Sequence, residues 1–194
     1  MTIPNPHPEL FGSIVTLRIF DTDQIHEKYI DWLNDPIVNR FSQRGRGRPT
    51  GKKDAENYLS NLKADEVVLG IYVEPHGHVG NVKYGPIDWA NSLADISIMI
   101  GEPAVWGSNV GSEAVYLVSK YMFETLGLNR VEAGSNNPAF LRLVEKLGWR
   151  VEGILRQRIK TSDGFIDHTL VSQLSEEFKQ LPAYEVSTSS IVLT

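Results

Sequence analysis

The sequence predicts an α/β fold in which about four helices flank a mixed central sheet of about six to seven strands. Three observations point to this class. Short segments of alternating apolar and polar residues are interleaved with segments whose apolar residues recur at helical spacing. Residues typical of turns separate these segments. The chain has 194 residues, of which 41% are hydrophobic, and this is enough to bury the core of one domain.

Composition excludes several classes of function. The chain has no cysteine, which excludes disulfides, thiolate metal sites and cysteine nucleophiles. No apolar run approaches the roughly 20 residues that span a bilayer, and the first residues lack the layout of a secretory signal. We therefore expect a cytoplasmic protein with no membrane partner. The net charge of −5 argues against a nucleic-acid partner, because phosphate binding needs concentrated lysine and arginine.

The first half of the chain opens with a strand and then a helix. Residues 15–19 alternate between apolar and polar, and residues 21–23, Asp-Thr-Asp, offer side-chain oxygens for the N-cap of the following helix. That helix is expected to end before Pro36, because proline disfavours helical geometry in the residue before it. The patterns that follow predict a helix at 55–62 and strands at 66–73, 78–84 and 95–100.

The second half begins with a long amphipathic helix, predicted at 112–124. A short strand at 130–133 and a helix at 138–147 follow, the latter opened by a proline and closed by a glycine. Two strands at 152–160 and 165–173 flank a turn and predict a hairpin. We expect one domain over residues 1–181 and a tail over 182–194, which is either a disordered end or an added edge strand.

A small-residue loop between a strand and the long helix predicts an anion-binding site. Backbone N–H groups at a helix N-terminus are unpaired and lie at the positive end of the helix dipole, and glycine lets a pyrophosphate approach closely. The sequence lacks the patterns of the Rossmann and Walker phosphate sites. The strand ends in Ile98, Met99 and Ile100, and the loop and helix start comprise Trp106, Gly107, Ser108, Asn109, Val110, Gly111 and Ser112.

Residues 106–114 look like the acyl-CoA pyrophosphate loop of the GNAT acetyltransferases, often written Q/R-x-x-G-x-G/A. Asn137 to Phe140 and residues 145–153 resemble the second acyl-CoA signature of that superfamily, N-x-x-S…E-K-x-G-F…E-G. The resemblance runs over residues 15–173. It implies the GNAT fold, with a sheet that splays at the acyl-CoA site, and acetyl-CoA as co-substrate with no metal. Besides the loop and the strand end, it implies that Asn137 and Phe140 contact the coenzyme.

The sequence departs from the family pattern in several places. Trp106 stands where the loop usually has Gln or Arg, and Asn109 where it has its first Gly. Asn tolerates left-handed geometry better than most residues, so we still expect the loop to form. Phe140 stands where relatives often have Ser, and Val144 where others in the superfamily have a Tyr that protonates the leaving thiolate. A tyrosine general acid is therefore missing from that position.

The resemblance implies direct attack by a neutral amine on the thioester. An alkyl ammonium has a pKa of about 10.4, so a carboxylate, an imidazole or a water chain has to remove its proton. Asp95, at the start of a strand, is the preferred base. His168 is the second candidate, because histidine titrates in the useful range. His76 and His78 lie near a turn, but no third ligand stands at metal spacing, so no metal site is expected.

The acceptor is expected to be a small-molecule amine. Residues 29–41 resemble the first helices of GNAT enzymes that acetylate amino-sugar nucleotides, and more distantly the Rim-type N-terminal acetyltransferases of ribosomal proteins. Tyr29 and Trp32 offer rings for stacking, and a lid with Arg44, Arg46 and Arg48 offers guanidinium groups for a diphosphate. A protein N-terminal acetyltransferase and a non-catalytic acyl-CoA-binding module remain alternatives, and a homodimer is left open.

Overall fold

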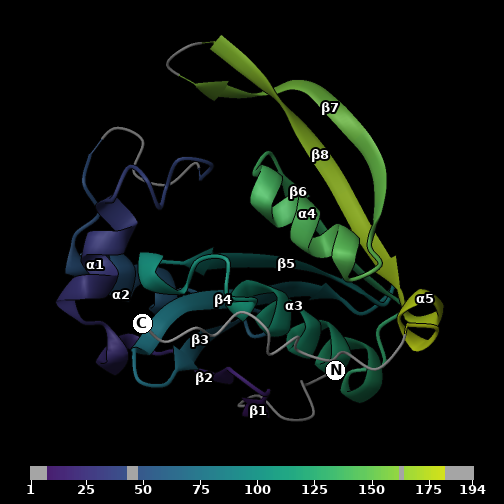
Figure 1. Cartoon of the computed structure of the whole chain (residues 1–194), viewed down its shortest axis with the longest axis horizontal. Helices are drawn as coiled ribbons and strands as arrows, with labels where there is room; N and C mark the ends of the chain where they lie inside the picture. Colours follow the sequence, from purple (N-terminus) through teal and green to yellow (C-terminus); the bar gives the residue numbers. More distant parts are fainter. Residues whose placement is uncertain (1–7, 43–47, 162–163, 182–194) are drawn as a thin grey trace.

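The computed structural model describes residues 8–42, 48–161 and 164–181. Eight strands form one sheet in the order β1-β2-β3-β4-β5-β6-β8-β7 (Figure 1). Neighbouring strands are antiparallel, except that β5 and β6 are parallel, so the sheet is mixed as predicted. The strands are β1 (Leu10–Phe11), β2 (Thr16–Ile19), β3 (Val67–Val73), β4 (Gly77–Asp88), β5 (Leu93–Ile100), β6 (Arg130–Ser135), β7 (Arg150–Thr161) and β8 (Gly164–Leu174).

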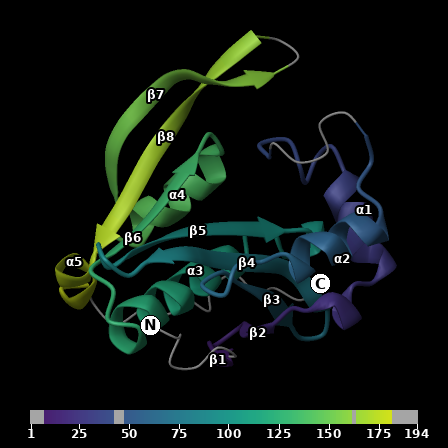
Figure 2. The same ribbon diagram turned by 180° about the vertical axis from the view of Figure 1, so that it is seen from behind.

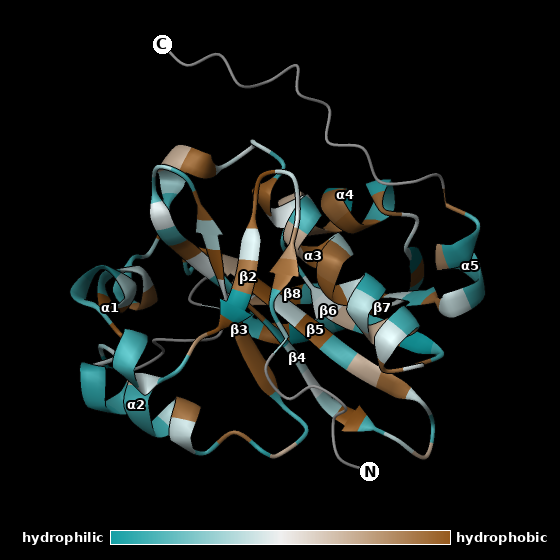
Figure 3. Cartoon of the chain, turned by 90° about the horizontal axis from the view of Figure 1, so that it is seen from below, coloured by the Kyte–Doolittle hydropathy of each residue, from teal (hydrophilic) through white to brown (hydrophobic). Residues whose placement is uncertain are grey.

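The helices lie at both ends of the molecule and, in the case of α3, beneath the middle of the sheet (Figures 1 and 2). Figures 1 and 2 place α1 and α2 at one end and α4 beneath the arch of the β7–β8 hairpin at the other. Figure 3 shows α2 as mainly hydrophilic, as expected for a helix with one face in water. The α-helices are α1 (Glu27–Asn34), α2 (Lys52–Ser60), α3 (Val110–Lys120), α4 (Pro138–Lys146) and α5 (Ser175–Lys179). Within the described residues, no helix is long and apolar enough to cross a membrane.

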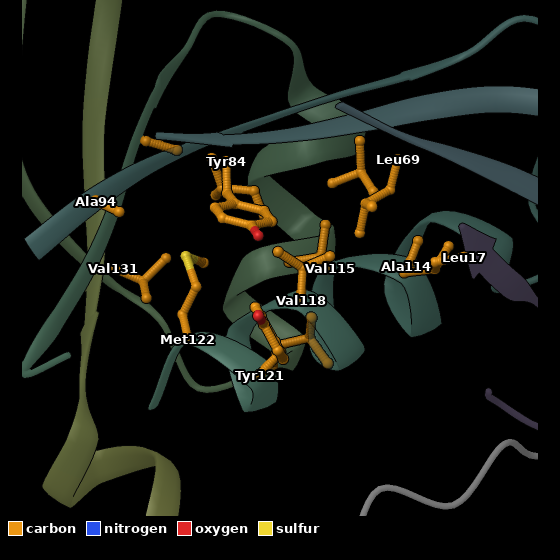
Figure 4. Packing of buried hydrophobic residues seen from close by; sticks show 14 of the residues in the cluster. Leu17, Leu69, Tyr84, Ala94, Ala114, Val115, Val118, Tyr121, Met122 and Val131 are labelled. Carbon is orange, nitrogen blue, oxygen red and sulfur yellow. The ribbon is translucent and has the colours of Figure 1, made fainter. Parts of the chain in front are cut away.

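Two hydrophobic clusters hold the sheet and helices together. The larger one packs α3 against the sheet, with fully buried side chains that include Leu69, Tyr84 and Val118 (Figure 4). The smaller one includes Tyr29, Trp32 and Val68 and lies between the sheet and the helices α1 and α2. Side chains alternate between the two faces of a strand. The two faces of β3 therefore belong to different clusters, and the face that carries Val68 is the one covered by α1 and α2.

The structure corrects several predicted boundaries. Asp21 caps a 3-10 helix (Thr22–Gln24), and α1 begins later, where the Nδ1 atom of His26 accepts a hydrogen bond from Tyr29 N–H. The long helix ends at Lys120 and continues as a π-helix (Tyr121–Thr125). The strand predicted at 78–84 extends to Asp88. The sheet has eight strands because the two-residue β1 also joins it, and α5 is an additional short helix.

The sheet opens between β5 and β6. Their parallel pairing covers only residues 93–95 of β5 and 130–132 of β6. Beyond this point β5 pairs with β4, and β6 pairs with β8. The edge of β5 at residues 96–100 that faces β6 is therefore free of strand partners within the described chain. This divergence is the predicted splay.

The β7–β8 hairpin forms the outer end of the sheet. Its strands are joined in antiparallel register, interrupted by irregularities after Val151 and Leu155. The hairpin exposes large apolar side chains, with 65% of Val151, 58% of Ile154 and 60% of Phe165 open to solvent. The predicted hairpin is confirmed.

Candidate active site

A cavity of about 650 Å³ opens where β5 and β6 diverge. It extends from the start of α3, past the free edge of β5, to the face covered by α1 and α2. All of the predicted coenzyme-binding residues except Ser108 line it, namely Ile98, Met99, Ile100, Trp106, Gly107, Asn109, Val110, Gly111, Ser112, Asn137 and Phe140. The Ser108 hydroxyl instead donates a hydrogen bond to the Val105 carbonyl at 2.6 Å.

The loop before α3 has the geometry of an anion site. Asn109 is the N-cap of α3 and adopts a left-handed conformation, with φ of 66°, and Gly107 has φ of 79°. These conformations turn the chain so that the first N–H groups of α3 face outward from the helix end. Such groups have no partner within the helix, and the helix dipole gives them a positive potential. This end of the cavity suits a phosphate.

Gly111 keeps space between α3 and α4. A Cβ atom at this position would lie 3.1 Å from Leu143 Cδ1 and 3.9 Å from side-chain atoms of Ile98 and Ile100. All three neighbours line the cavity. A side chain on Gly111 would therefore fill the space beside the free edge of β5.

Trp106 closes the end of that free edge. Its indole Nε1–H donates a hydrogen bond to the Ile100 carbonyl at 3.0 Å, while 45% of the side chain stays exposed. The ring thus braces the loop against the last residue of β5. Trp106, which stands where the family usually has Gln or Arg, therefore links the loop to the end of β5 through a hydrogen bond.

Asp95 lies on the same face of β5 as Ser97, which lines the cavity, but does not line the cavity itself. In the parallel ladder it stands opposite Glu132. Partial burial and the neighbouring Glu132 carboxylate raise the pKa of Asp95 to about 6, against the opposing effect of Lys83. Asp95 as a whole residue is exposed on β5. Asp95 and Ser97 are two strand positions apart, about 7 Å, so the Asp95 carboxylate is separated from the cavity by more than the length of a hydrogen bond.

His168 lies on β8 against β6. Its ring covers Gly134, where a Cβ atom would lie 2.2 Å from the Nε2 atom. The Nδ1 atom is buried and has no hydrogen-bond partner within the described residues. Burial, and secondarily the charge of Arg158, lower the pKa of His168. Gly134 lines the cavity and His168 does not, so the imidazole lies behind the cavity wall.

Only some of the residues predicted to bind the acceptor line the cavity. Tyr29 lines the cavity. Trp32 does not: it is only 4% exposed, and its ring packs so closely on Gly101 that a Cβ there would lie 2.1 Å from it. The structure therefore places the Trp32 ring in the core and not among the cavity residues. Arg44 and Arg46 lie outside the described residues.

Arg48 is held away from the cavity. Its guanidinium forms two hydrogen bonds with the Asp54 carboxylate, at 2.7 and 2.6 Å. Asp54 also accepts a hydrogen bond from Gly51 N–H at the start of α2. Arg48 therefore stabilises the start of α2 and is not a cavity residue.

Sequence reasoning missed several polar residues of the cavity and a pair of histidines beside it. The cavity residues are Asn39, Ser42, Asn81 and Ser97. His26 and His78 form a hydrogen bond of 2.9 Å between Nε2 and Nδ1. The two histidines are 52 residues apart in the chain, so no local motif joins them. Among the described residues, no group of three or more His, Cys, Asp or Glu side chains is placed to hold a metal ion.

Comparisons with known proteins agree with this geometry. The family model described as "Acetyltransferase (GNAT) domain" matches residues 15–150. The chain is similar to a human alpha/beta-tubulin-N-acetyltransferase, with 34% identity over 91% of this chain and 88% of the relative. It is also 34% identical to the N-acetyltransferase p20 of Bacillus licheniformis, over 52% of this chain and only 57% of that relative.

The solved structures give the same fold. The ribosomal L7/L12 α-N-protein acetyltransferase RimL, in complex with coenzyme A, superposes with a TM-score of 0.77 over 86% of this chain and 98% of that one. The two sequences are 11% identical, so the likeness concerns the fold alone.

Proposed function

Because the chain belongs to the GNAT acetyltransferase family, we propose that it transfers the acetyl group of acetyl-CoA to the primary amine of a peptide or protein. N-acetyltransferase activity follows from the family. The acceptor is the proposed part. The observation that carries the proposal is the single cavity that joins the start of α3 to the face covered by α1 and α2.

The residues of the coenzyme half of the cavity, at 98–112 and 134–143, fit an acyl-CoA. The first N–H groups of α3 would bind the pyrophosphate, and the free edge of β5 offers main-chain groups to the extended part of the molecule. Acetyl-CoA supplies the activated thioester. Phe140 and Leu143 of α4 give this half an apolar wall that excludes water.

Asp95 is the proposed base. With a pKa of about 6 it is ionised at neutral pH, yet basic enough to take up a proton. Its place two positions from Ser97 favours proton transfer through a water molecule. His168 lies behind Gly134 and remains the second candidate, with water as the third.

The acceptor half of the cavity favours an acceptor without several positive charges. Its lining residues are Tyr29, Ile37, Val38, Asn39, Phe41, Ser42, Tyr58, Asn81 and Lys83. No carboxylate lines the cavity among the described residues. The positive charge of Lys83 is offset by an ion pair with Glu66 at 2.5 Å. A polyamine would therefore find no counter-charge here. A peptide N-terminus brings one amine and several hydrogen-bonding groups, which suit the neutral polar side chains.

A relative that matches over most of the chain supports the same acceptor class. The human protein is named for acetylation of tubulin and aligns with 91% of this chain. An amino-sugar nucleotide is the second candidate, because the sequence of α1 resembles enzymes of that kind and residues 40–53 are rich in Lys and Arg.

Release of free coenzyme A thiol from acetyl-CoA, screened across amines, tests the proposal. The panel comprises N-terminal peptides, a nucleotide-linked amino sugar and spermidine, with product masses measured. We expect turnover with peptides and an added acetyl group on the peptide amine. Turnover with the amino sugar alone would transfer the assignment to the second candidate. Binding of acetyl-CoA without turnover of any amine would indicate a non-catalytic module.

A further inference from the structure

A chain of hydrogen bonds runs from α1 into the face of the sheet that bears the acceptor half. Tyr29 N–H donates to His26 Nδ1 at 3.1 Å, and His26 Nε2 lies 2.9 Å from His78 Nδ1. A backbone N–H only donates, so Nδ1 of His26 must be the acceptor. In neutral His26 the proton is therefore on Nε2 and is donated to His78 Nδ1. His78 must then carry its own proton on Nε2.

His78 is fixed in this orientation by aromatic neighbours. Its ring stacks on Phe20 at 4.6 Å with an angle of 17° between the planes. The ring centroids of Trp32 and Tyr72 lie 5.4 and 5.3 Å from that of His78. Burial, and secondarily the charge of His26, lower the pKa of His78 to about 4, so the ring is neutral at physiological pH. The Nε2 atom is buried without a hydrogen-bond partner of good geometry among the described residues.

Asn81 is the polar residue that connects this chain to the cavity. It lines the cavity, is 9% exposed, and lies close enough to His78 to interact with it. Both its Oδ1 and its Nδ2 are buried and lack a partner among the described residues. Buried polar groups in native proteins are almost always paired. An unpaired amide in a cavity wall therefore points to a ligand.

We propose that Asn81 binds the carbonyl oxygen next to the acceptor amine, and that His26 and His78 position it for this role. His78 Nε2–H can be satisfied only by an acceptor, and two groups are close enough to act as one, the Gly80 main chain and the Asn81 side chain. The side-chain acceptor is Asn81 Oδ1. This contact turns the Nδ2 amino group of Asn81 toward the cavity, where it offers donors. The inference rests on the proposed peptide acceptor, whose first carbonyl oxygen lies one carbon beyond the carbon that bears the amine. A polyamine has no such oxygen.

Binding of two matched ligands to the coenzyme A-loaded protein tests this role. One is a short peptide, and the other is the same peptide with its first peptide bond replaced by a trans-alkene, which keeps the shape but removes the carbonyl oxygen together with the amide N–H. Only the loss of the oxygen is expected to depend on Asn81, because the Nδ2 group of Asn81 is a donor. By calorimetry, Asn81→Ala should weaken binding of the peptide about tenfold and change binding of the alkene less than about twofold. Asn81→Leu, which keeps the volume, should behave in the same way if the alanine variant folds poorly.

The histidines are tested with a variant that preserves the stack. His78→Phe keeps a ring on Phe20 but removes the donor, so it should weaken binding of the peptide about threefold or more and leave the alkene unaffected. His76→Phe is the matched control, because His76 is exposed two residues away. It should change neither affinity.

Three outcomes would overturn the inference. Equal weakening of both ligands, with a lower melting temperature, would assign Asn81 a structural role. A loss of acetyl-CoA affinity in Asn81→Ala would place the amide at the thioester. Wild-type protein that binds peptide and alkene equally would show that the carbonyl is not recognised. If wild-type protein binds neither ligand but releases coenzyme A with another amine, the peptide acceptor itself is wrong, and this inference with it.

Discussion

The hydrogen-bonding groups proposed for the coenzyme half of the cavity belong to the main chain, whereas those of the acceptor half belong to side chains. In the coenzyme half, the start of α3 and the free edge of β5 offer N–H and C=O groups, and Gly111 leaves space for a ligand. In the acceptor half, the polar groups are side chains from separate parts of the chain, such as Asn39, Ser42 and Asn81, and the His26–His78 pair lies beside them. A main-chain site requires a particular local conformation and leaves a compact motif. A site made of distant side chains leaves none.

The largest expected effect is in the coenzyme half. Gly111→Trp should reduce acetyl-CoA affinity about a thousandfold, because the indole would fill the space beside Leu143 and Ile100. Calorimetry measures the affinity, and circular dichroism checks the fold. Lys120→Trp, on the exposed end of the same helix, is the control and should bind normally. Unchanged affinity in Gly111→Trp would remove the coenzyme from this loop.

The next effect is on catalysis. Asp95→Asn should lower kcat about a hundredfold and flatten the acidic limb of the pH profile. In the wild-type protein this limb should lie near pH 6, because the base acts when ionised and burial with Glu132 raises its pKa to about 6. Glu132→Gln removes the like charge and should shift the limb to lower pH. A loss of less than threefold in Asp95→Asn would assign the role to His168 or to water.

His78, beside the acceptor half, should make the free energy of unfolding depend on pH. The pKa of His78 is about 4 in the folded protein and 6.5 as its ordinary value, so the unfolded chain binds a proton first as the pH falls. The stabilisation is complete above pH 6.5 and is lost toward pH 4. Wild-type protein should lose about 2 kcal/mol from this group between pH 7 and pH 5. Urea unfolding should show a smaller loss in His78→Phe.

Asp95 acts in the opposite direction, since its raised pKa gives a contribution that is lost as the pH rises through about 6. Asp95 is present in both the wild-type protein and His78→Phe. Its contribution therefore cancels when the pH dependence of one protein is subtracted from that of the other. His26, whose pKa is also lowered by burial, contributes in the same direction as His78. Equal pH dependence in wild type and His78→Phe would contradict the buried neutral state of His78.

The smallest effect is expected from the arginines. Changing Arg44, Arg46 and Arg48 together to Gln should leave kcat/KM for a peptide within about threefold, because exposed ion pairs such as Arg48–Asp54 contribute little. Acetyl-CoA affinity should also be constant. A rise of about tenfold in KM for a nucleotide-linked amino sugar, steeper at low salt, would favour the second candidate acceptor.

The sequence predicted the sheet, the hairpin and the residues around the start of α3, because periodicity and the small-residue loop are local signals. It placed the N-cap of the first α-helix within residues 21–23 instead of at His26, because a histidine cap is not among the usual signals. Trp32 was assigned to the acceptor, since spacing alone does not tell a core ring from a cavity ring. The role of Trp106 depends on a hydrogen bond to Ile100 that only the folded loop creates.

Strand β7 lies at the edge of the sheet, where it could pair with a strand of another molecule and start aggregation. An edge strand exposes backbone groups that can template a strand from another molecule, and exposed apolar residues such as Ile154 increase this risk. Four positive side chains on β7 oppose such templating, and the irregularities in its ladder twist the edge. The cations are Arg150, Arg156, Arg158 and Lys160. Replacing these four residues with neutral ones should make β7 more prone to pair with other molecules and to form fibrils.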